Sequence, residues 1–196
     1  MAKEYLKTTI EEYLTDIASR SAVPGGGSAT ALTAATAAGL NLMVMAYSKK
    51  NEVRDNEKLD ALYAVQKKGF KKLLTLIDKD CEVFRALMDK LASKSSAEQE
   101  YINAAQVPME ICRESANCLR AVSYLIENGN KNLLTDVGCA AHMFKASFYS
   151  AKLNVEINLK HIKNAALCKN IRSEIKQIEE EINRICDNAY VFLAKT

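Results

Sequence analysis

The stretch Pro24-Gly25-Gly26-Gly27-Ser28, with the uncharged run from Ser28 to Tyr47 that follows it, decides the fold of this chain. Three of the seven glycines and one of the two prolines lie in the first five of these residues, which predicts a tight bend. Glycine permits positive φ angles and a close approach of the backbone to a ligand. Ser28 is a favoured N-cap residue, so we expect a helix to start there.

A glycine bend of this kind has two interpretations. The helix N-terminus that follows it presents unpaired N–H groups and a positive dipole end, which suit an anion or a carbonyl oxygen. Alternatively, the bend is only a tight connector that lets two helices pack. The residues alone favour neither interpretation.

The uncharged run is about 20 residues long, which is enough to cross a bilayer. It consists mainly of Ala, Thr and Gly, it contains Asn41, and its strongly apolar residues cluster in 40–45. A helix without charges on any side is also typical of the centre of a helical bundle. We therefore expect a central, buried helix and no membrane span.

Apolar residues recur at spacings of three and four along the rest of the chain, which predicts helices throughout. The expected helices cover 5–17, 28–47, about 55–91, a segment around Pro108 that ends at Glu127, about 131–166 and 171–192, with a polar connection at 49–52. Pro108 must either begin a helix or kink a continuing one. The last stripe is a heptad seam that packs within the bundle or against a second subunit. The fold class is all-α: a multi-helix up-and-down bundle around the charge-free helix.

Composition supports a single domain over residues 1–196, since 48% of the residues are hydrophobic and 26% are charged. The net charge of +3 suits an anionic ligand. No block of Lys and Arg is interleaved with aromatic residues, so we expect no nucleic-acid partner. The six cysteines form no C-x-x-C pair and the N-terminus has no apolar signal core, which predicts reduced thiols and a cytoplasmic location.

Asp80 lies on an apolar helix face between Ile77 and Phe84. Burying an unpaired carboxylate is costly, so this side chain must be paired, hydrogen-bonded or functional. Desolvation would raise its pKa and suit a general acid or base. The structural alternative is a carboxylate that caps a neighbouring helix or meets a lysine.

Asp136 opens another predicted helix and, at about 100° per residue, shares one face with Ser147, Asn154, Asn158 and His161. Polar residues on one face of an apolar helix indicate a hydrated groove. Asp136 and Asn154 are ~27 Å apart along the axis, so one small ligand cannot touch both in one chain. Either Asn154 and Asn158 support another helix, or a symmetric partner brings the opposite ends together. Asp136 is either functional or a first-turn carboxylate favoured by the helix dipole.

Metal and nucleotide sites have weak support. His142 follows Cys139 by three residues, which is half of a zinc site, but no second pair and no Glu-x-x-His motif are present. The glycine bend lacks both the Gly-Lys-Ser/Thr of a P-loop and the Gly-x-Gly-x-x-Gly of a dinucleotide fold. We expect neither a metal nor a nucleotide.

Three blocks resemble the cyclodeaminase/cyclohydrolase family of folate enzymes, and they occur in the family's order over residues 1 to about 165. They are Ser21-Ala-Val-Pro-Gly-Gly-Gly-Ser-Ala29 with its helix through Met45, the helix around Asp80 and Phe84, and Gly129-Asn130 with Thr135-Asp136-Val-Gly-Cys-Ala-Ala141 continuing to Leu159. Thr135 stands where the family usually has Ser, and Cys139 where it usually has a branched aliphatic residue. Neither change removes a group that the chemistry needs.

The resemblance implies a helical homodimer with the glycine bend at the active site, a tetrahydrofolate substrate that can be polyglutamylated, and no cofactor beyond that substrate. We expect Asp136 to be the principal acid/base or cation-stabilising carboxylate and Asp80 the second. The residues expected to bind substrate are Pro24, Gly25, Gly26, Gly27, Ser28, Asn130, Asn154 and Asn158.

The chain's size favours a stand-alone methenyltetrahydrofolate cyclohydrolase, which hydrolyses 5,10-methenyltetrahydrofolate to 10-formyltetrahydrofolate. The alternative is a formiminotetrahydrofolate cyclodeaminase, which converts 5-formiminotetrahydrofolate to the methenyl form and ammonia. A non-catalytic helical interaction module is a third interpretation, because a fold does not fix a function.

Overall fold

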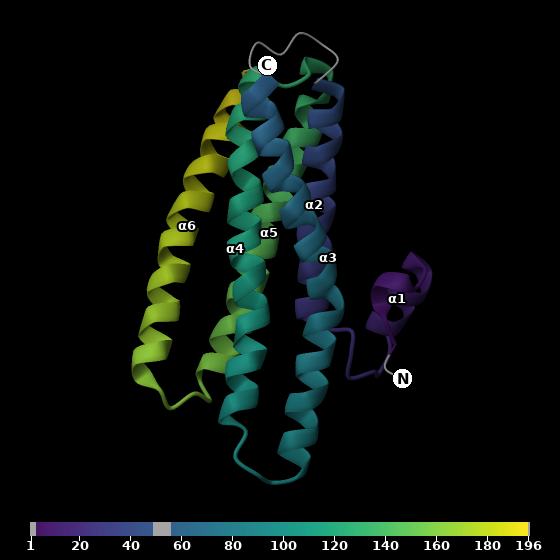
Figure 1. Ribbon diagram of the computed structural model, residues 1–196, viewed down its shortest axis with the longest axis vertical. Helices are drawn as coiled ribbons and strands as arrows, with labels where there is room; N and C mark the ends of the chain where they lie inside the picture. Colours follow the sequence, from purple (N-terminus) through teal and green to yellow (C-terminus); the bar gives the residue numbers. More distant parts are fainter. Residues whose placement is uncertain (1–2, 49–55, 196) are drawn as a thin grey trace.

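The computed structural model describes residues 3–48 and 56–195, and these residues contain helices and no strand. The elements are η1 (Tyr5–Lys7), α1 (Ile10–Ile17), α2 (Gly26–Ser48), α3 (Asn56–Ala92), α4 (Glu98–Asn128), η2 (Lys131–Leu133), α5 (Leu134–Leu159) and α6 (Ala165–Leu193). The expected all-α, up-and-down bundle is confirmed (Figure 1). The expected connection at 49–52 lies outside the described residues.

The five long helices α2 to α6 run alternately up and down, and α1 lies beside the bundle at the start of α2 (Figure 1). Helix α2 packs against α3, α4 and α5, whereas α6 covers α4 and α5 at one edge. The backbone N–H of Asn130 donates to Oγ of Ser48 at 2.9 Å. The start of α5 therefore lies at the C-terminal end of α2, opposite the glycine bend.

Helix α2 is central but only half buried. Its inner face is formed by small side chains such as Ala34, Ala38 and Asn41, which let the neighbouring helices approach closely. Its outer face carries no charge and stays partly exposed. Among the described helices, α2 alone is long and apolar enough to cross a membrane, but half of its apolar window lies inside the bundle. This packing supports a bundle helix, as expected from its composition.

Three predicted helix boundaries were wrong. Helix α2 begins at Gly26 rather than at Ser28, and the opening helix is divided into η1 and α1. Helix α5 ends at Leu159 rather than near Ala166, because the side chain of Asn164 accepts the N–H of Leu167 and caps a new helix.

The structure answers two questions that the sequence left open, namely the role of Pro108 in α4 and the packing partner of the heptad seam in α6. Pro108 lies inside a continuous α4. The heptad seam of α6 packs within the bundle, since Ile175, Ile182 and Ile185 are buried. Two Arg–Glu pairs join the helices beside this seam, namely Arg113–Glu174 at 2.6 Å and Arg120–Glu181 at 2.7 Å.

Candidate active site

The first turn of α2 is capped by a side chain from another helix. Gly25 lies at the N-cap position but has no side chain, although its carbonyl accepts the N–H of Ala29 at 3.0 Å. Asp80 of α3 takes over the capping role, because its Oδ2 accepts the N–H of Ser28 at 2.9 Å. The carboxylate that the sequence indicates on an apolar helix face is thus fixed at the glycine bend.

Gly27 is the position where this arrangement requires glycine. A Cβ atom there would overlap the carboxylate of Asp80, whereas a Cβ on Gly26 would make an ordinary contact with the Asn154 amide, 3.8 Å away. No glycine in the described residues has the positive φ angle that glycine permits. The bend therefore uses glycine for close approach to Asp80 and not for an unusual backbone conformation.

Burial raises the pKa of Asp80 from 3.8 to about 6, and the hydrogen bond from the Ser28 N–H opposes this rise. No basic side chain contributes to the balance. A carboxylic acid with a pKa near neutrality exists in both protonation states under ordinary conditions. This property suits a general acid or base.

Asp80 faces a pocket of about 350 Å³ between the glycine bend, α3, α4 and the C-terminal part of α5. Asn154 and Asn158 line its α5 side. The Asn154 amide nitrogen donates to the Ser150 carbonyl at 2.9 Å, and that of Asn158 donates to the Asn154 carbonyl at 2.8 Å. Because both amide nitrogens already donate within the protein, the amide oxygens are the groups that can accept a ligand N–H or O–H.

Aromatic side chains complete the pocket, and sequence reasoning did not assign them to the site. Phe84 lines it from α3, and the rings of Tyr101 and His161 stack with their centroids 4.3 Å apart. His161 lies three residues after Asn158 on the polar face already noted, so the pattern contained a signal for it. The sequence contained no such signal for Tyr101, because only the packing of α4 against α3 and α5 brings this side chain to the pocket.

Two of the substrate-binding residues expected at the glycine bend do not reach the pocket. Pro24 is buried and is not among the lining residues. Ser28 is 0% exposed, and its hydroxyl bonds to the Tyr13 hydroxyl at 3.0 Å while its N–H bonds to Asp80. Ser28 therefore supports the carboxylate instead of meeting a ligand. Gly25, Gly26 and Gly27 do line the pocket.

Asn130 and Asp136 lie at the other end of α2. The 23 residues of α2 place this end roughly 35 Å from the glycine bend. The side chain of Asn130 accepts the N–H of Asn132 and caps η2, and Asp136 lies in the first turn of α5. The structure does not bring these two residues to the pocket within one chain, in agreement with the axial separation deduced from the sequence.

Among the described residues, no further metal ligand lies beside the half-site formed by Cys139 and His142. Cys139 and His142 are exposed, and the His142 ring lies edge-on to Tyr190. Across residues 3–48 and 56–195, no group of three or more His, Cys, Asp or Glu side chains is placed to hold a metal ion.

The glycine bend, Asp80 and the polar face of α5 all lie within a segment that matches a known family. The family model described as formiminotransferase-cyclodeaminase matches residues 9–177. The chain belongs to this family. The family expected from the three sequence blocks is thereby confirmed.

Individual relatives carry two different names. A methenyltetrahydrofolate cyclohydrolase from Methylorubrum extorquens is 29% identical, and the match covers 93% of this chain and 94% of that protein. A formimidoyltransferase-cyclodeaminase from Sus scrofa is 27% identical over 90% of this chain, which spans 35% of that longer protein. The crystal structure of a formiminotetrahydrofolate cyclodeaminase from Thermotoga maritima superposes with a TM-score of 0.91 and 30% identity, covering 96% of this chain and 97% of that one.

Proposed function

We propose that this chain is a methenyltetrahydrofolate cyclohydrolase and that Asp80 is its catalytic general base. The observation that carries the proposal is the partly desolvated carboxylate that lines a pocket in a chain of this family. One relative that this chain matches over nearly its whole length is named as a cyclohydrolase. Relatives named as enzymes also make a non-catalytic module the weaker interpretation.

The pocket suits one ring system of a reduced folate. Its volume of about 350 Å³ is at the small end of ligand pockets, so the benzoyl and glutamate parts would extend outside it. Phe84 offers an apolar ring for the pterin, and the amide oxygens of Asn154 and Asn158 accept N–H groups. The mild positive charge of the chain suits a glutamate tail, including a polyglutamate.

The proposed reaction needs only water and one well-placed carboxylate. Ionised Asp80 takes a proton from water as the water oxygen bonds to the methenyl carbon, which is part of a delocalised cation. The protonated Asp80 then returns this proton to N5 as the bond from this carbon to N5 breaks, the remaining hydroxyl proton of the adduct is released to water, and the formyl group stays on N10. The carboxylate charge also stabilises the cationic substrate. No cofactor beyond the folate takes part in this proposal.

The cyclodeaminase reaction is the second candidate, because the similar Thermotoga structure carries that name. In it N10 attacks the formimino carbon, and ammonia leaves after it gains a proton. Purified protein supplied with each substrate separates the two. We expect accelerated loss of methenyl absorbance and no ammonia from 5-formiminotetrahydrofolate; ammonia release would reverse the assignment.

The proposal includes a homodimer through the outer side of α1 and α2. Helix α1 exposes Ile10 (78%) and Leu14 (55%). Beside it an uncharged groove of about 380 Å³ follows α2, lined by Leu32, Ala35, Thr36, Gly39, Leu40, Met43, Phe70 and Leu74. Single subunits rarely expose continuous apolar faces, and a stable homodimer buries roughly 800 Å² of each subunit. A second copy supplies the same uncharged face about a two-fold axis.

A charge in this groove tests the dimer. Thr36 is exposed and bonds only to its own helix, so Thr36→Glu costs the folded subunit little. Light scattering should show a dimer for the parent protein and a monomer for Thr36→Glu. Val191→Glu, at an exposed apolar site on α6, is the control and should stay dimeric. A parent protein that is monomeric at micromolar concentration would refute this part of the proposal.

The dimer also offers a role for Asp136. A two-fold axis across the middle of α2 makes the two α2 helices antiparallel, which matches their dipoles favourably. Each glycine bend then lies at the end of the bundle that carries Asn130 and Asp136 of the partner subunit. In this arrangement Asp136 serves the pocket of the other copy. The cytoplasmic location expected from the cysteine pattern remains a prediction.

A further inference from the structure

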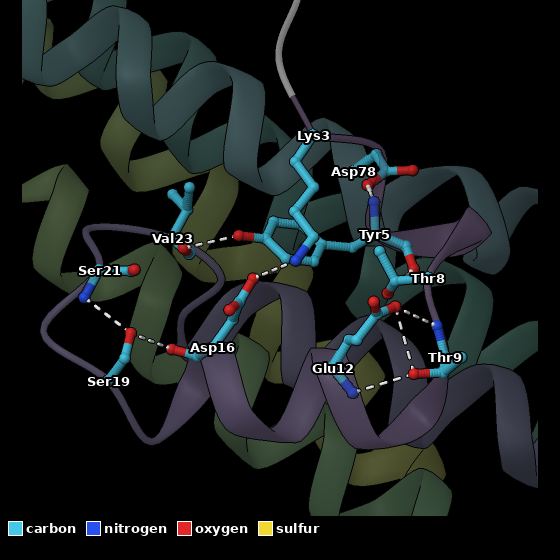
Figure 2. A network of polar contacts seen from close by, with 10 residues as sticks. All are labelled: Lys3, Tyr5, Thr8, Thr9, Glu12, Asp16, Ser19, Ser21, Val23 and Asp78. Atoms are coloured by element: carbon cyan, nitrogen blue, oxygen red, sulfur yellow. Dashed lines mark hydrogen bonds and ion pairs between the residues drawn. The ribbon is translucent and has the colours of Figure 1, made fainter.

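Residues 3–23 form an arm that is fixed to the bundle from both ends. Asp78 of α3 accepts the N–H of Tyr5 at 2.5 Å and that of Leu6 at 3.3 Å. Within the arm, a capping box starts α1 at Thr9 and Lys3 pairs with Asp16 at 2.7 Å (Figure 2). The arm therefore has a defined shape of its own, and its orientation is set by α3.

Two tyrosines connect the inner side of this arm to the glycine bend. The hydroxyl of Tyr5 donates to the carbonyl of Val23 at 2.9 Å (Figure 2). The hydroxyl of Tyr13 bonds to Oγ of Ser28 at 3.0 Å. The two rings meet edge to face with centroids 5.7 Å apart, and both side chains are buried. One tyrosine holds the chain before the bend and the other holds the chain after it.

Ser28 links the arm to the catalytic carboxylate. It is fully buried, its hydroxyl contacts Tyr13, and its N–H donates to Asp80. The orientation of that N–H follows the position of the first turn of α2. Without Tyr13 the buried Ser28 hydroxyl would lose this bond and keep only its contact with the Cys81 thiol, so the first turn of α2 would be held less firmly.

We propose that Tyr13 is a positioning residue for Asp80 and acts through Ser28, from a helix that contributes no side chain to the pocket. This inference rests on the proposed function only in its kinetic test, which needs turnover of a folate substrate. Tyr13 fixes Ser28, and the Ser28 N–H fixes the carboxylate oxygen that it caps. Without a rigid donor, the carboxylate would have a less defined direction toward the pocket.

A pH experiment on Asp80 must distinguish its titration from that of the other titratable groups nearby. Burial raises the pKa of the Cys81 thiol to about 11 and also raises the pKa of the Tyr13 hydroxyl. Neither group titrates near pH 6. Arg85 on α3 lies close enough to Cys81 to oppose the rise in the thiol pKa. His161 lines the same pocket, so His161→Gln must accompany the series.

The test compares Tyr13→Phe with Tyr5→Phe. Each loses one buried tyrosine hydroxyl bond at the glycine bend, but only Tyr13→Phe affects Ser28. We expect Tyr13→Phe to lower kcat about tenfold with little change in KM and to move the acid limb of kcat/KM upward by about half a pH unit or more, since the carboxylate loses a donor. Tyr5→Phe should lose similar thermal stability and leave the acid limb in place. Ser28→Ala should reproduce the Tyr13→Phe shift, and the double variant should add nothing.

Carboxyl ¹³C titration of Asp80 gives a second readout that needs no turnover. The Asp80 pKa should rise in Tyr13→Phe and stay constant in Tyr5→Phe. A Tyr13→Phe variant that melts earlier but keeps the parent pH limb and Asp80 titration would show a purely structural role. Lack of folate turnover in the parent would overturn the proposed function, and the titration would still decide on Tyr13.

Discussion

The two carboxylates that the sequence singles out lie beside opposite ends of α2, and their surroundings differ. At the N-terminal end, Asp80 reaches across from α3, caps the helix and faces a pocket. At the C-terminal end, Asp136 lies in the first turn of α5, beside a loop whose polar groups bond to one another. The comparison indicates that neighbouring elements decide whether a carboxylate is enclosed in a pocket of its own chain, which the sequence of its own helix cannot determine.

Replacing Asp80 is the strongest way to test this difference. Asp80→Asn keeps an oxygen for the Ser28 N–H but cannot accept a proton, so turnover should fall about 10²–10⁴-fold. Asp89→Asn, at an exposed position on the same helix, is the matched control and should retain parent activity. Initial rates with 5,10-methenyltetrahydrofolate give the comparison. An Asp80→Asn enzyme within threefold of the parent would remove Asp80 from catalysis.

Mixed dimers test whether Asp80 of one copy and Asp136 of the other copy form one active site. If one copy supplies Asp80 and the other Asp136, exchange between Asp80→Asn and Asp136→Asn dimers creates one intact site in each mixed dimer. Since half of the dimers are mixed, activity should recover to about a quarter of the parent value. Lack of recovery in a sample shown by mass spectrometry to contain mixed dimers would leave Asp136 without a role in this pocket.

Gly27→Ala tests the close approach at the bend. The added methyl group overlaps the Asp80 carboxylate, which must rotate away from the Ser28 N–H. We expect kcat to fall about 10–100-fold, because a displaced acid/base group loses its alignment. Gly25→Ala is the control, since its Cβ would meet nothing within 4 Å. Equal rates for the two variants would contradict the requirement for space at residue 27.

The smallest expected effect is on the free energy of unfolding, because burying the ionised Asp80 side chain in the pocket destabilises the folded protein. Its pKa is about 6 in the folded chain and near 3.8 when unfolded, so its contribution to stability is present below pH 3.8 and is lost as the pH rises toward 6. Asp80→Asn should therefore stabilise the protein by about 1–3 kcal/mol at pH 7.5, and this gain should vanish near pH 4. Urea unfolding at both pH values provides the measurement. A variant less stable than the parent at pH 7.5 would show that the carboxylate is not under desolvation strain.

Much of the fold and part of the site could be predicted from the sequence. Helical spacing indicated the bundle, and the position of Asp80 on an apolar face indicated either a cap or an acid/base group; the structure places it in a pocket while it also caps α2. Spacing could not show that Ser28 turns inward to Tyr13, because this depends on how the arm docks. Tyr101 joins the pocket only through packing between distant helices.

The most direct measurement is the carboxyl ¹³C titration of Asp80 in the folded protein, with Asp80→Asn to assign the signal and Asp89 as an exposed internal reference. A desolvated carboxylate held by one backbone donor predicts a pKa of about 6 for Asp80. A folate analogue should perturb the Asp80 signal and leave that of Asp89 unchanged. An Asp80 pKa near 4 that no folate analogue perturbs would contradict the assignment of this pocket as the catalytic site.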